Sequence, residues 1–229
     1  MHAGDDMERL ALLWEQEHLL LVVGARRFVL DTGSPMSFGE GGSVTCDGDS
    51  VPLPTSLAGL SAATLSGFLG GPVDGLLGND FIARFDWRFD LPNGTATASR
   101  EPLAVAGTRV PLRFVQTVPV MQGQVAGQTV SLLFDSGAKL SYLERSLTTG
   151  FPDAGTVNDF MPMFGAFTAA TVHAPMVVSG RAFALRFGAA PQLVQLALTM
   201  TGSSGIVGAE LLQSSAVGYA PRRSELVLV

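Results

Sequence analysis

The sequence predicts a mostly β fold built from two similar lobes, and three observations lead to this prediction. A short motif occurs twice, as Phe28-Val-Leu-Asp31-Thr-Gly-Ser34 and as Leu132-Leu-Phe-Asp135-Ser-Gly-Ala138. A second motif follows each copy, Gly75-Leu-Leu-Gly78 and then Gly205-Ile-Val-Gly208. The chain also has 27 glycines and 13 prolines between strand-length apolar runs, which is typical of many short strands joined by turns. An internal repeat within 229 residues favours two lobes.

The first elements lead to the first motif. Residues 1–15 are expected to form an N-terminal tail and a first element, and the pattern from Glu8 to Glu15 fits a helix and a strand equally well. The first lobe is expected at 16–100. It begins with a hairpin, Leu19–Val23 and Arg27–Leu30, that ends at Asp31.

The rest of the first lobe contains further turn and strand patterns. The Asp47-Gly-Asp49 turn predicts a hairpin over Ser43–Leu53. After Gly75–Gly78 the sequence predicts a short helix over Phe81–Phe85, with Asn79 or Asp80 as its N-cap. A closing hairpin follows, with one strand on each side of Pro92-Asn-Gly94.

The second lobe is expected to repeat this plan. Residues 101–115 are predicted to connect the lobes, and residues 116–229 to form the second. Its opening hairpin, Val118–Val125 and Thr129–Phe134, ends at Asp135. The interval before the second glycine motif is longer than in the first copy, and we expect the extra residues around Asn158–Ala190.

Composition excludes several functional classes. The net charge is −6 and no basic cluster occurs, which argues against a nucleic-acid partner. No apolar run is long enough to span a membrane, and no targeting segment is recognisable, so we expect a cytoplasmic protein without a membrane partner. Cys46 is the only cysteine and cannot form an internal disulfide, which fits a reducing compartment.

Two Asp-Thr/Ser-Gly loops have a specific chemical use. The glycine permits a tight turn and leaves its N–H free to donate to the carboxylate. If the loops pair, Asp31 and Asp135 approach within about 3–4 Å and share a proton or a water. Like charges at that distance repel by about 4 kcal/mol, so one proton is held over a wide pH range. Such a pair activates water without a metal or a cofactor, and we expect neither.

These residues resemble the paired signatures of aspartic proteases, and the segment Val73–Phe81 is similar to the compact bacterial single-chain group of pepsin-like and retropepsin-like proteins. The resemblance covers both lobes and implies a bilobal aspartic-protease fold, with double-psi-like β-barrel lobes and a few short helices. It implies an aspartic endopeptidase that needs no cofactor and acts on a peptide or unfolded protein, with the oligomeric state open and a monomer plausible. Asp31 and Asp135 would be catalytic, and the residues supporting them would be Thr32, Gly33, Ser34, Ser136 and Gly137, with Thr32 and Ser136 forming a hydroxyl lock.

Departures from the family pattern leave a second function open, a non-catalytic peptide-binding or scaffolding protein on the same fold. The first lobe has no tyrosine for a flap, and the hairpin over Ser43–Leu53 is a short flap candidate. Ala138 lacks the hydroxyl of Ser34, which is expected to raise the pKa of Asp135 and move activity towards near-neutral pH. Lys139 is expected to be a solvated charge at a strand edge.

Other catalytic readings have less support. His18 and His173 would permit a Ser-His-Asp hydrolase, but no Gly-x-Ser-x-Gly motif occurs. Together with His2, these histidines show no metal-ligand spacing. Cys46 is expected to be a small apolar filler in the core.

Overall fold

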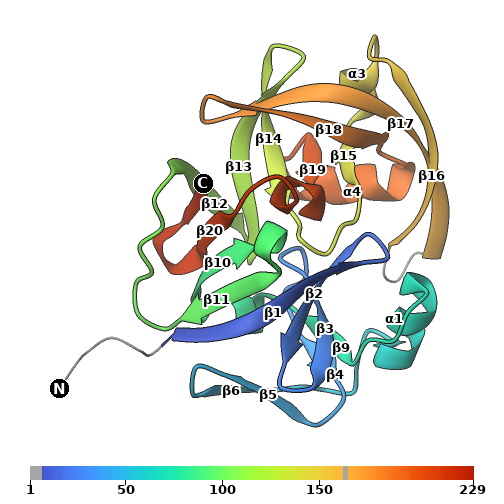
Figure 1. The fold of residues 1–229 in the computed structure, drawn as a ribbon. Helices are drawn as coiled ribbons and strands as arrows, with labels where there is room; N and C mark the ends of the chain where they lie inside the picture. The colour runs from blue at the N-terminus through green and yellow to red at the C-terminus, as the bar shows by residue number, and fades with distance from the viewer. Residues whose placement is uncertain (1–6, 162–164) are drawn as a thin grey trace.

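The computed structural model describes residues 7–161 and 165–229, and they form a mostly β fold with a few short helices, as predicted. We call β1–β11 the first half and β12–β21 the second half (Figure 1). The elements of the first half are β1 (Met7–Glu15), β2 (His18–Val23), β3 (Arg26–Leu30), β4 (Phe38–Gly39), β5 (Ser43–Cys46), β6 (Asp49–Pro52), β7 (Ser56–Leu57), β8 (Leu60–Ser61), α1 (Ala62–Leu69), β9 (Gly75–Leu77), α2 (Asn79–Ile82), β10 (Asp86–Asp90), η1 (Leu91–Asn93) and β11 (Thr95–Ser99).

The second half runs through the same kinds of element with a longer central part. Its elements are β12 (Thr108–Val115), β13 (Val118–Val125), β14 (Gln128–Phe134), β15 (Ser141–Leu143), α3 (Arg145–Thr148), β16 (Asp153–Met161), β17 (Gly165–Val178), β18 (Arg181–Ala189), α4 (Gln192–Thr201), β19 (Gly205–Val207), η2 (Ala209–Leu212), β20 (Val217–Ala220), η3 (Pro221–Arg223) and β21 (Glu225–Leu228). The extra length lies in β16, β17 and β18, where the sequence places it.

Corresponding strands of the two halves pair in the same way. In the first half β2 and β3 form a hairpin, and β3 runs parallel to β9 with Leu30 opposite Leu77. In the second half β13 and β14 form the hairpin, and β14 runs parallel to β19 with Phe134 opposite Val207. Leu30 is followed by Asp31, and Phe134 is followed by Asp135. The same strand arrangement therefore positions both carboxyl groups.

Three local expectations need correction or refinement. The segment over Glu8–Glu15 is a strand, since β1 pairs with both β2 and β11. The predicted connection at 101–115 contains β12, which pairs with β13 and β21. The predicted helix at Phe81–Phe85 begins earlier and is shorter, with Gly78 as its N-cap; the Asn79 amide instead donates to the carbonyls of Thr32 and Ser34.

The two halves are joined by a continuous antiparallel sheet. The order of its strands is β1, β11, β10, β20, β21 and β12, and Trp87 of β10 lies opposite Tyr219 of β20. Trp87 packs with Phe85 and Phe89, all of them fully buried. The main hydrophobic core extends through both halves, so neither half is a separate packing unit.

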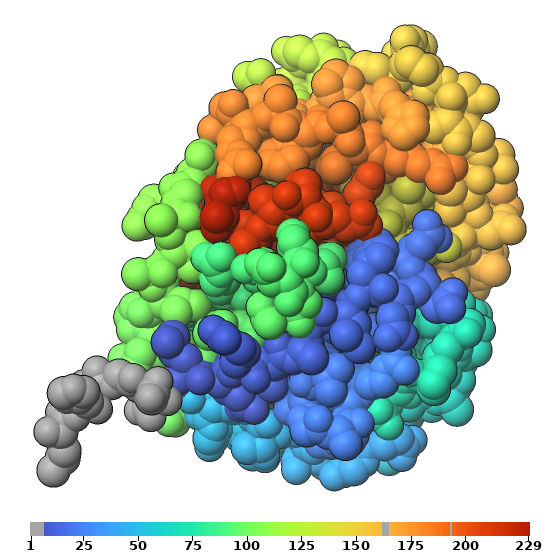
Figure 2. All heavy atoms as spheres, viewed as in Figure 1, coloured from blue at the N-terminus to red at the C-terminus, as the bar shows by residue number. Residues whose placement is uncertain are grey.

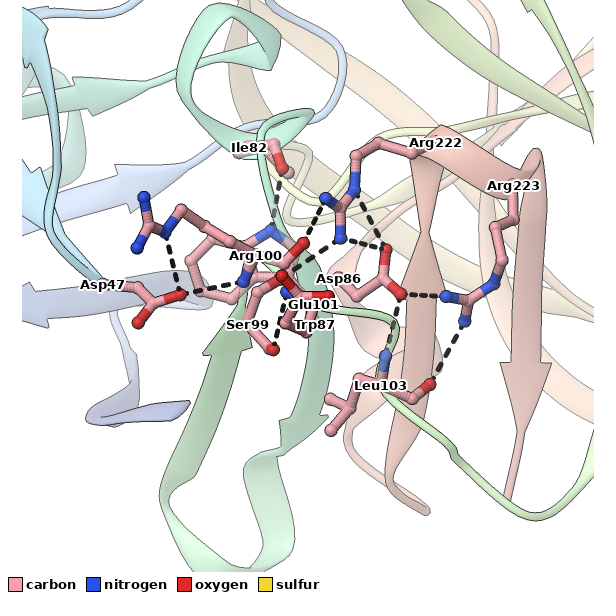
Figure 3. A network of polar contacts seen from close by, with 10 residues as sticks. All are labelled: Asp47, Ile82, Asp86, Trp87, Ser99, Arg100, Glu101, Leu103, Arg222 and Arg223. Carbon is pink, nitrogen blue, oxygen red and sulfur yellow. Dashed lines mark hydrogen bonds and ion pairs between the residues drawn. The ribbon is translucent and has the colours of Figure 1, made fainter. Parts of the chain in front are cut away.

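A charge network centred on the buried Asp86 lies beside this junction (Figure 3). Asp86, only 1% exposed, accepts from Arg222 and Arg223 of the second half and from the backbone N–H of Leu103. Arg222 and Arg223 also donate to the carbonyls of Arg100 and Leu103. Both oxygens of the Asp86 carboxylate therefore accept hydrogen bonds, and two of the donors are arginines of the other half of the chain.

The described residues include no helix that is both long and apolar enough to cross a membrane.

Candidate active site

Asp31 and Asp135 occupy equivalent places at the ends of β3 and β14. The backbone N–H of Asp31 donates to the Leu77 carbonyl at 2.9 Å, and that of Asp135 donates to the Val207 carbonyl at the same distance. The strand pairing thus continues one residue into each loop. The four-residue glycine motifs recognised in the sequence supply these two carbonyls.

Thr32 and Ser136 form a reciprocal lock between the two loops. The Thr32 hydroxyl donates to the Phe134 carbonyl at 2.7 Å and accepts from the Ser136 backbone N–H at 2.9 Å. The Ser136 hydroxyl likewise donates to the Leu30 carbonyl at 2.7 Å and accepts from the Thr32 backbone N–H at 3.1 Å. Both side chains are fully buried. Each loop therefore satisfies buried groups of the other, which fixes the two loops face to face.

Gly33 and Gly137 hold the carboxylates from their own loop and touch the carboxylate of the opposite loop. Gly33 N–H donates to Asp31 Oδ1 at 2.8 Å, and Gly137 N–H donates to Asp135 Oδ1 at 3.0 Å. A Cβ on Gly33 would lie 2.5 Å from Asp135 Oδ2, and one on Gly137 would lie 2.4 Å from Asp31 Cγ. Glycine is needed at both positions because the opposite carboxyl group occupies the space of a side chain.

Burial and proximity change the acidity of both aspartates. Desolvation raises the pKa of Asp31 well above its ordinary value, and the charge of Asp135 and a hydrogen bond with it raise the pKa further. Desolvation also raises the pKa of Asp135, while hydrogen bonds from Asp31, Gly137 and Ala138 lower it. Both pKa values are therefore raised, and two carboxyl groups that interact this closely are expected to titrate as a pair that shares one proton.

The expected roles of Ser34 and Ala138 need correction. The Ser34 hydroxyl donates to the Met36 carbonyl at 2.9 Å, and Ser34 holds Asp31 Oδ1 only through its backbone N–H, at 3.0 Å. Ala138 does the same for Asp135, with its backbone N–H at 3.2 Å. The missing hydroxyl at position 138 therefore removes no donor that Ser34 supplies to Asp31. Burial, rather than this substitution, raises the pKa of Asp135.

A cleft of about 500 Å³ lies over the two carboxylates. One wall is apolar and comes from the first half, including side chains from β3, β8, β9 and α1. The other wall comes from the second half and combines apolar residues with Lys139, Tyr142 and Asp159. The main apolar residues of the first wall are Val29, Phe38, Leu60, Leu65, Leu69 and Leu76.

The predicted flap over Ser43–Leu53 does not contribute to this cleft. It forms the expected hairpin, but Val44, Cys46 and Val51 are buried in the main core. The β16–β17 hairpin of the second half borders the cleft instead, through Phe160 and Phe167. The hairpin that borders the cleft therefore belongs to the second half, whereas the sequence predicted a flap between Asp31 and the first glycine motif.

An aromatic contact joins the β16–β17 hairpin to the opposite half. The ring of Phe160 stacks on that of Phe68 in α1, with centroids 4.8 Å apart and an angle of 11° between the planes. Figure 2 shows the surfaces of these two regions meeting at one side of the molecule, α1 in teal and the hairpin in yellow to orange. The contact joins Phe160, which lines the cleft, to a helix of the other half whose Leu65 and Leu69 also line it.

Three polar residues of the cleft were not identified as site residues from the sequence. His18 is 5% exposed, its Nδ1 lies 3.4 Å from the Gly137 carbonyl, and desolvation lowers its pKa, so the imidazole is neutral near pH 7. The Tyr142 hydroxyl donates to Asp159 Oδ2 at 2.5 Å, and Asp159 Oδ1 accepts from the Phe160 backbone N–H. These three residues lie far apart in the sequence and form no recognisable motif. The one signal in the sequence was the rarity of tyrosine, since Tyr142 is one of only two.

Lys139 is not the solvated charge expected from the sequence. Its side chain is 16% exposed and lines the cleft, and its Nζ lies 3.6 Å from Glu17 Oε2. Cys46 is buried, as expected, and desolvation raises the pKa of its thiol. Across residues 7–161 and 165–229, no three His, Cys, Asp or Glu side chains are grouped as metal ligands.

Comparisons with known proteins add little to this geometry. No protein-family model matches the chain. No curated protein matches it either. Among solved structures, the protease of simian foamy virus (mac) is similar over 40% of this chain and 88% of its own, with 13% identity and a TM-score of 0.30. A similarity of that size carries no argument, so the functional reasoning rests on the site itself.

Proposed function

We propose that this chain is an aspartic endopeptidase in which Asp31 and Asp135 activate a water molecule. The observation that carries the proposal is the reciprocal lock of Thr32 and Ser136. It places two half-buried carboxylates opposite each other at the floor of a cleft of about 500 Å³. If each aspartate only stabilised its own turn, the two carboxylates would not need to face each other or to lie at the floor of a cleft.

The proposed reaction needs only the two carboxyl groups and water. Asp135, as the ionised member, accepts a proton from the water, whose oxygen attacks the carbonyl carbon of the scissile bond. Asp31, as the protonated member, donates its proton to the carbonyl oxygen, giving a neutral tetrahedral diol. A proton from the Asp135 carboxyl then passes to the amide nitrogen as the C–N bond breaks. One hydroxyl of the diol returns its proton to Asp31, which restores the starting pair.

The walls of the cleft suggest what it binds. The first wall presents aliphatic side chains and Phe38, while the β16–β17 hairpin supplies Phe160. An extended peptide with large apolar side chains would bury them there, gaining about 1.5–3 kcal/mol for each fully buried side chain. We therefore propose a peptide or an unfolded protein segment as the substrate.

Cleavage of unfolded casein between pH 3 and pH 8 tests the proposal. We expect cleavage that a statine-type transition-state inhibitor blocks. Asp31→Asn and Asp135→Asn should each abolish it while the circular dichroism spectrum stays unchanged. Asp153→Asn, at an exposed strand position, is the matched control and should retain activity. Near-normal turnover in either dyad variant would show that the assignment is wrong.

The alternative function, a non-catalytic peptide-binding protein, gives a different result in the same experiment. It predicts no cleavage at any pH, together with peptide binding that Asp31→Asn does not abolish. Fluorescence anisotropy of a labelled apolar peptide separates this outcome from an inactive preparation.

A further inference from the structure

Lys139 is the only lysine of the chain, and it lies in an unusual position for an ammonium group. It follows Ala138, whose backbone N–H holds Asp135, and its side chain lines the wall of the cleft from the second half. The same side chain also borders a smaller cavity of about 300 Å³, next to Glu17 and Arg186. Lys139 therefore has open space on both sides.

The ammonium group is poorly neutralised for its degree of burial. Its side chain is 16% exposed, and within the described part of the chain its one ion pair is with Glu17, at 3.6 Å. The Glu17 side chain is 66% exposed, so water competes for it. An ammonium has three donors, and a charge withdrawn from water is costly unless it is paired and hydrogen-bonded.

The other acids that line the two cavities do not fill this role. Within the described residues, Lys139 forms no ion pair with Asp31, Asp135 or Asp159 of the cleft, nor with Glu210 of the smaller cavity. Both oxygens of Asp159 are already engaged, Oδ2 by the Tyr142 hydroxyl and Oδ1 by the Phe160 backbone N–H. The cleft thus offers a cation that lacks a strong internal partner.

We propose that Lys139 binds a carboxylate of the substrate. This inference rests on the proposed function and extends it to specificity. The cleft would select a peptide with apolar side chains towards the first half and a negative charge towards the second. The carboxylate could belong to an acidic side chain or to the C-terminus of the peptide, and both present the same chemistry to the ammonium group.

The test compares pairs of peptides that differ only in charge. Glu and Gln are exchanged at successive positions on each side of the cleaved bond, and each pair is made with a free and with an amidated C-terminus. We expect at least one Glu peptide to exceed its Gln partner by about tenfold in kcat/KM. A preference for the free form of a peptide over its amidated form would instead assign the terminal carboxylate. Equal rates within every Glu/Gln pair and between every free and amidated form would overturn the inference.

Variants at position 139 show whether this side chain is responsible. We expect Lys139→Arg to keep the preference, Lys139→Met to remove it, and Lys139→Glu to favour Gln over Glu. Glu17→Gln removes the competing carboxylate and should increase the preference. Each readout is the ratio of kcat/KM for the Glu peptide to kcat/KM for the Gln peptide, measured with the same variant. A general loss of activity or stability lowers both values and leaves this ratio unchanged. A preference unchanged in Lys139→Met would overturn the inference.

Failure of the proposed function can be distinguished from failure of this inference. If the protein cleaves Gln peptides and shows no charge preference, only the role of Lys139 is wrong. If it cleaves nothing, the peptidase proposal fails, and the same peptide pairs are then compared by fluorescence anisotropy. A binding preference for Glu that Lys139→Met removes would support the carboxylate site, and equal binding would overturn it.

Discussion

At the scale of single residues, the site depends on close contacts between the two loops. Gly33 and Gly137 each lie where a side chain would collide with the opposite aspartate. The hydroxyl groups of Thr32 and Ser136 each form the hydrogen bonds that buried backbone groups of the other loop would otherwise make with water. The contacts are symmetric, and desolvation raises the pKa of both aspartates.

The lock predicts a loss of stability when its hydroxyl is removed. Thr32→Ala leaves the Phe134 carbonyl and the Ser136 N–H without their buried partner. We expect the free energy of unfolding in urea to fall by about 1–3 kcal/mol. Thr32→Ser keeps the hydroxyl and should lose less. Equal stability of Thr32→Ala and the unmodified protein would contradict the role of the lock.

The raised pKa of Asp31 predicts a pH-dependent effect on stability. Because the pKa of Asp31 is higher in the folded state, its protonation contributes to the free energy of unfolding. This contribution is fully present below the pKa of the unfolded state, about 3.9, and is lost as pH rises through the pKa of the folded state. The Asp31→Asn variant has no carboxyl group to titrate at this position and should not lose this contribution. We expect the difference in free energy of unfolding, variant minus unmodified protein, to increase by about 1 kcal/mol or more between pH 4 and pH 8. A constant difference across this range would contradict the acidity assigned to the pair.

At the scale of elements, the β16–β17 hairpin and α1 both line the cleft and contact each other. Phe160 belongs to the second half and Phe68 to the first, and their stacked rings connect the two. Phe68 is 43% exposed despite the contact, so solvent reaches this position easily. A substrate bound in the cleft would lie against Phe160 and therefore beside this aromatic pair.

We expect the two rings to be energetically coupled. A double-mutant cycle of Phe68→Ala and Phe160→Ala on protein stability should give a coupling of about 0.5–1.5 kcal/mol. If the pair borders the substrate, both single variants should also change KM for casein more than they change kcat. Coupling near zero would mean that the rings only lie side by side.

Sequence reasoning predicted repeated local structure well and contacts between distant elements poorly. The hairpins ending at Asp31 and Asp135 follow from apolar strands and turn residues that are adjacent in the chain. The lock between Thr32 and Ser136 followed from the resemblance of the two motifs. By contrast, the burial of Lys139 and the pairing of Tyr142 with Asp159 depend on how β15 and β16 pack, which no local pattern encodes.

At the scale of the whole molecule, the halves are joined by backbone pairing, a shared core and buried charge. Asp86, at the centre of the charge network in Figure 3, is the first residue of β10, the strand that pairs with β20. Since the paired aspartates come from different halves, anything that loosens this junction also disturbs their relative position. Activity and global stability are therefore expected to fall together for variants at the junction.

Asp86 provides the sharpest test of this coupling. Asp86→Ala leaves the Leu103 N–H and the partly exposed Arg222 and Arg223 without the carboxylate that they share, and we expect a loss of about 1–3 kcal/mol in the free energy of unfolding. Glu225→Gln removes an ion pair with Arg109, whose side chain is 73% exposed, and should cost at most about 1 kcal/mol. Equal losses in chemical denaturation of the two variants would contradict the importance of burial.

The hydrogen bond from the Asp135 N–H to the Val207 carbonyl has a consequence for the timing of biosynthesis. A ribosome releases Asp31 and Asp135 well before Val207, so for that interval the nascent chain carries both acids without the strand that positions the second. The proposed catalytic pair can therefore assemble only after Val207 has been synthesised. If the proposal is right, a nascent chain that stops before this strand is expected to be inactive.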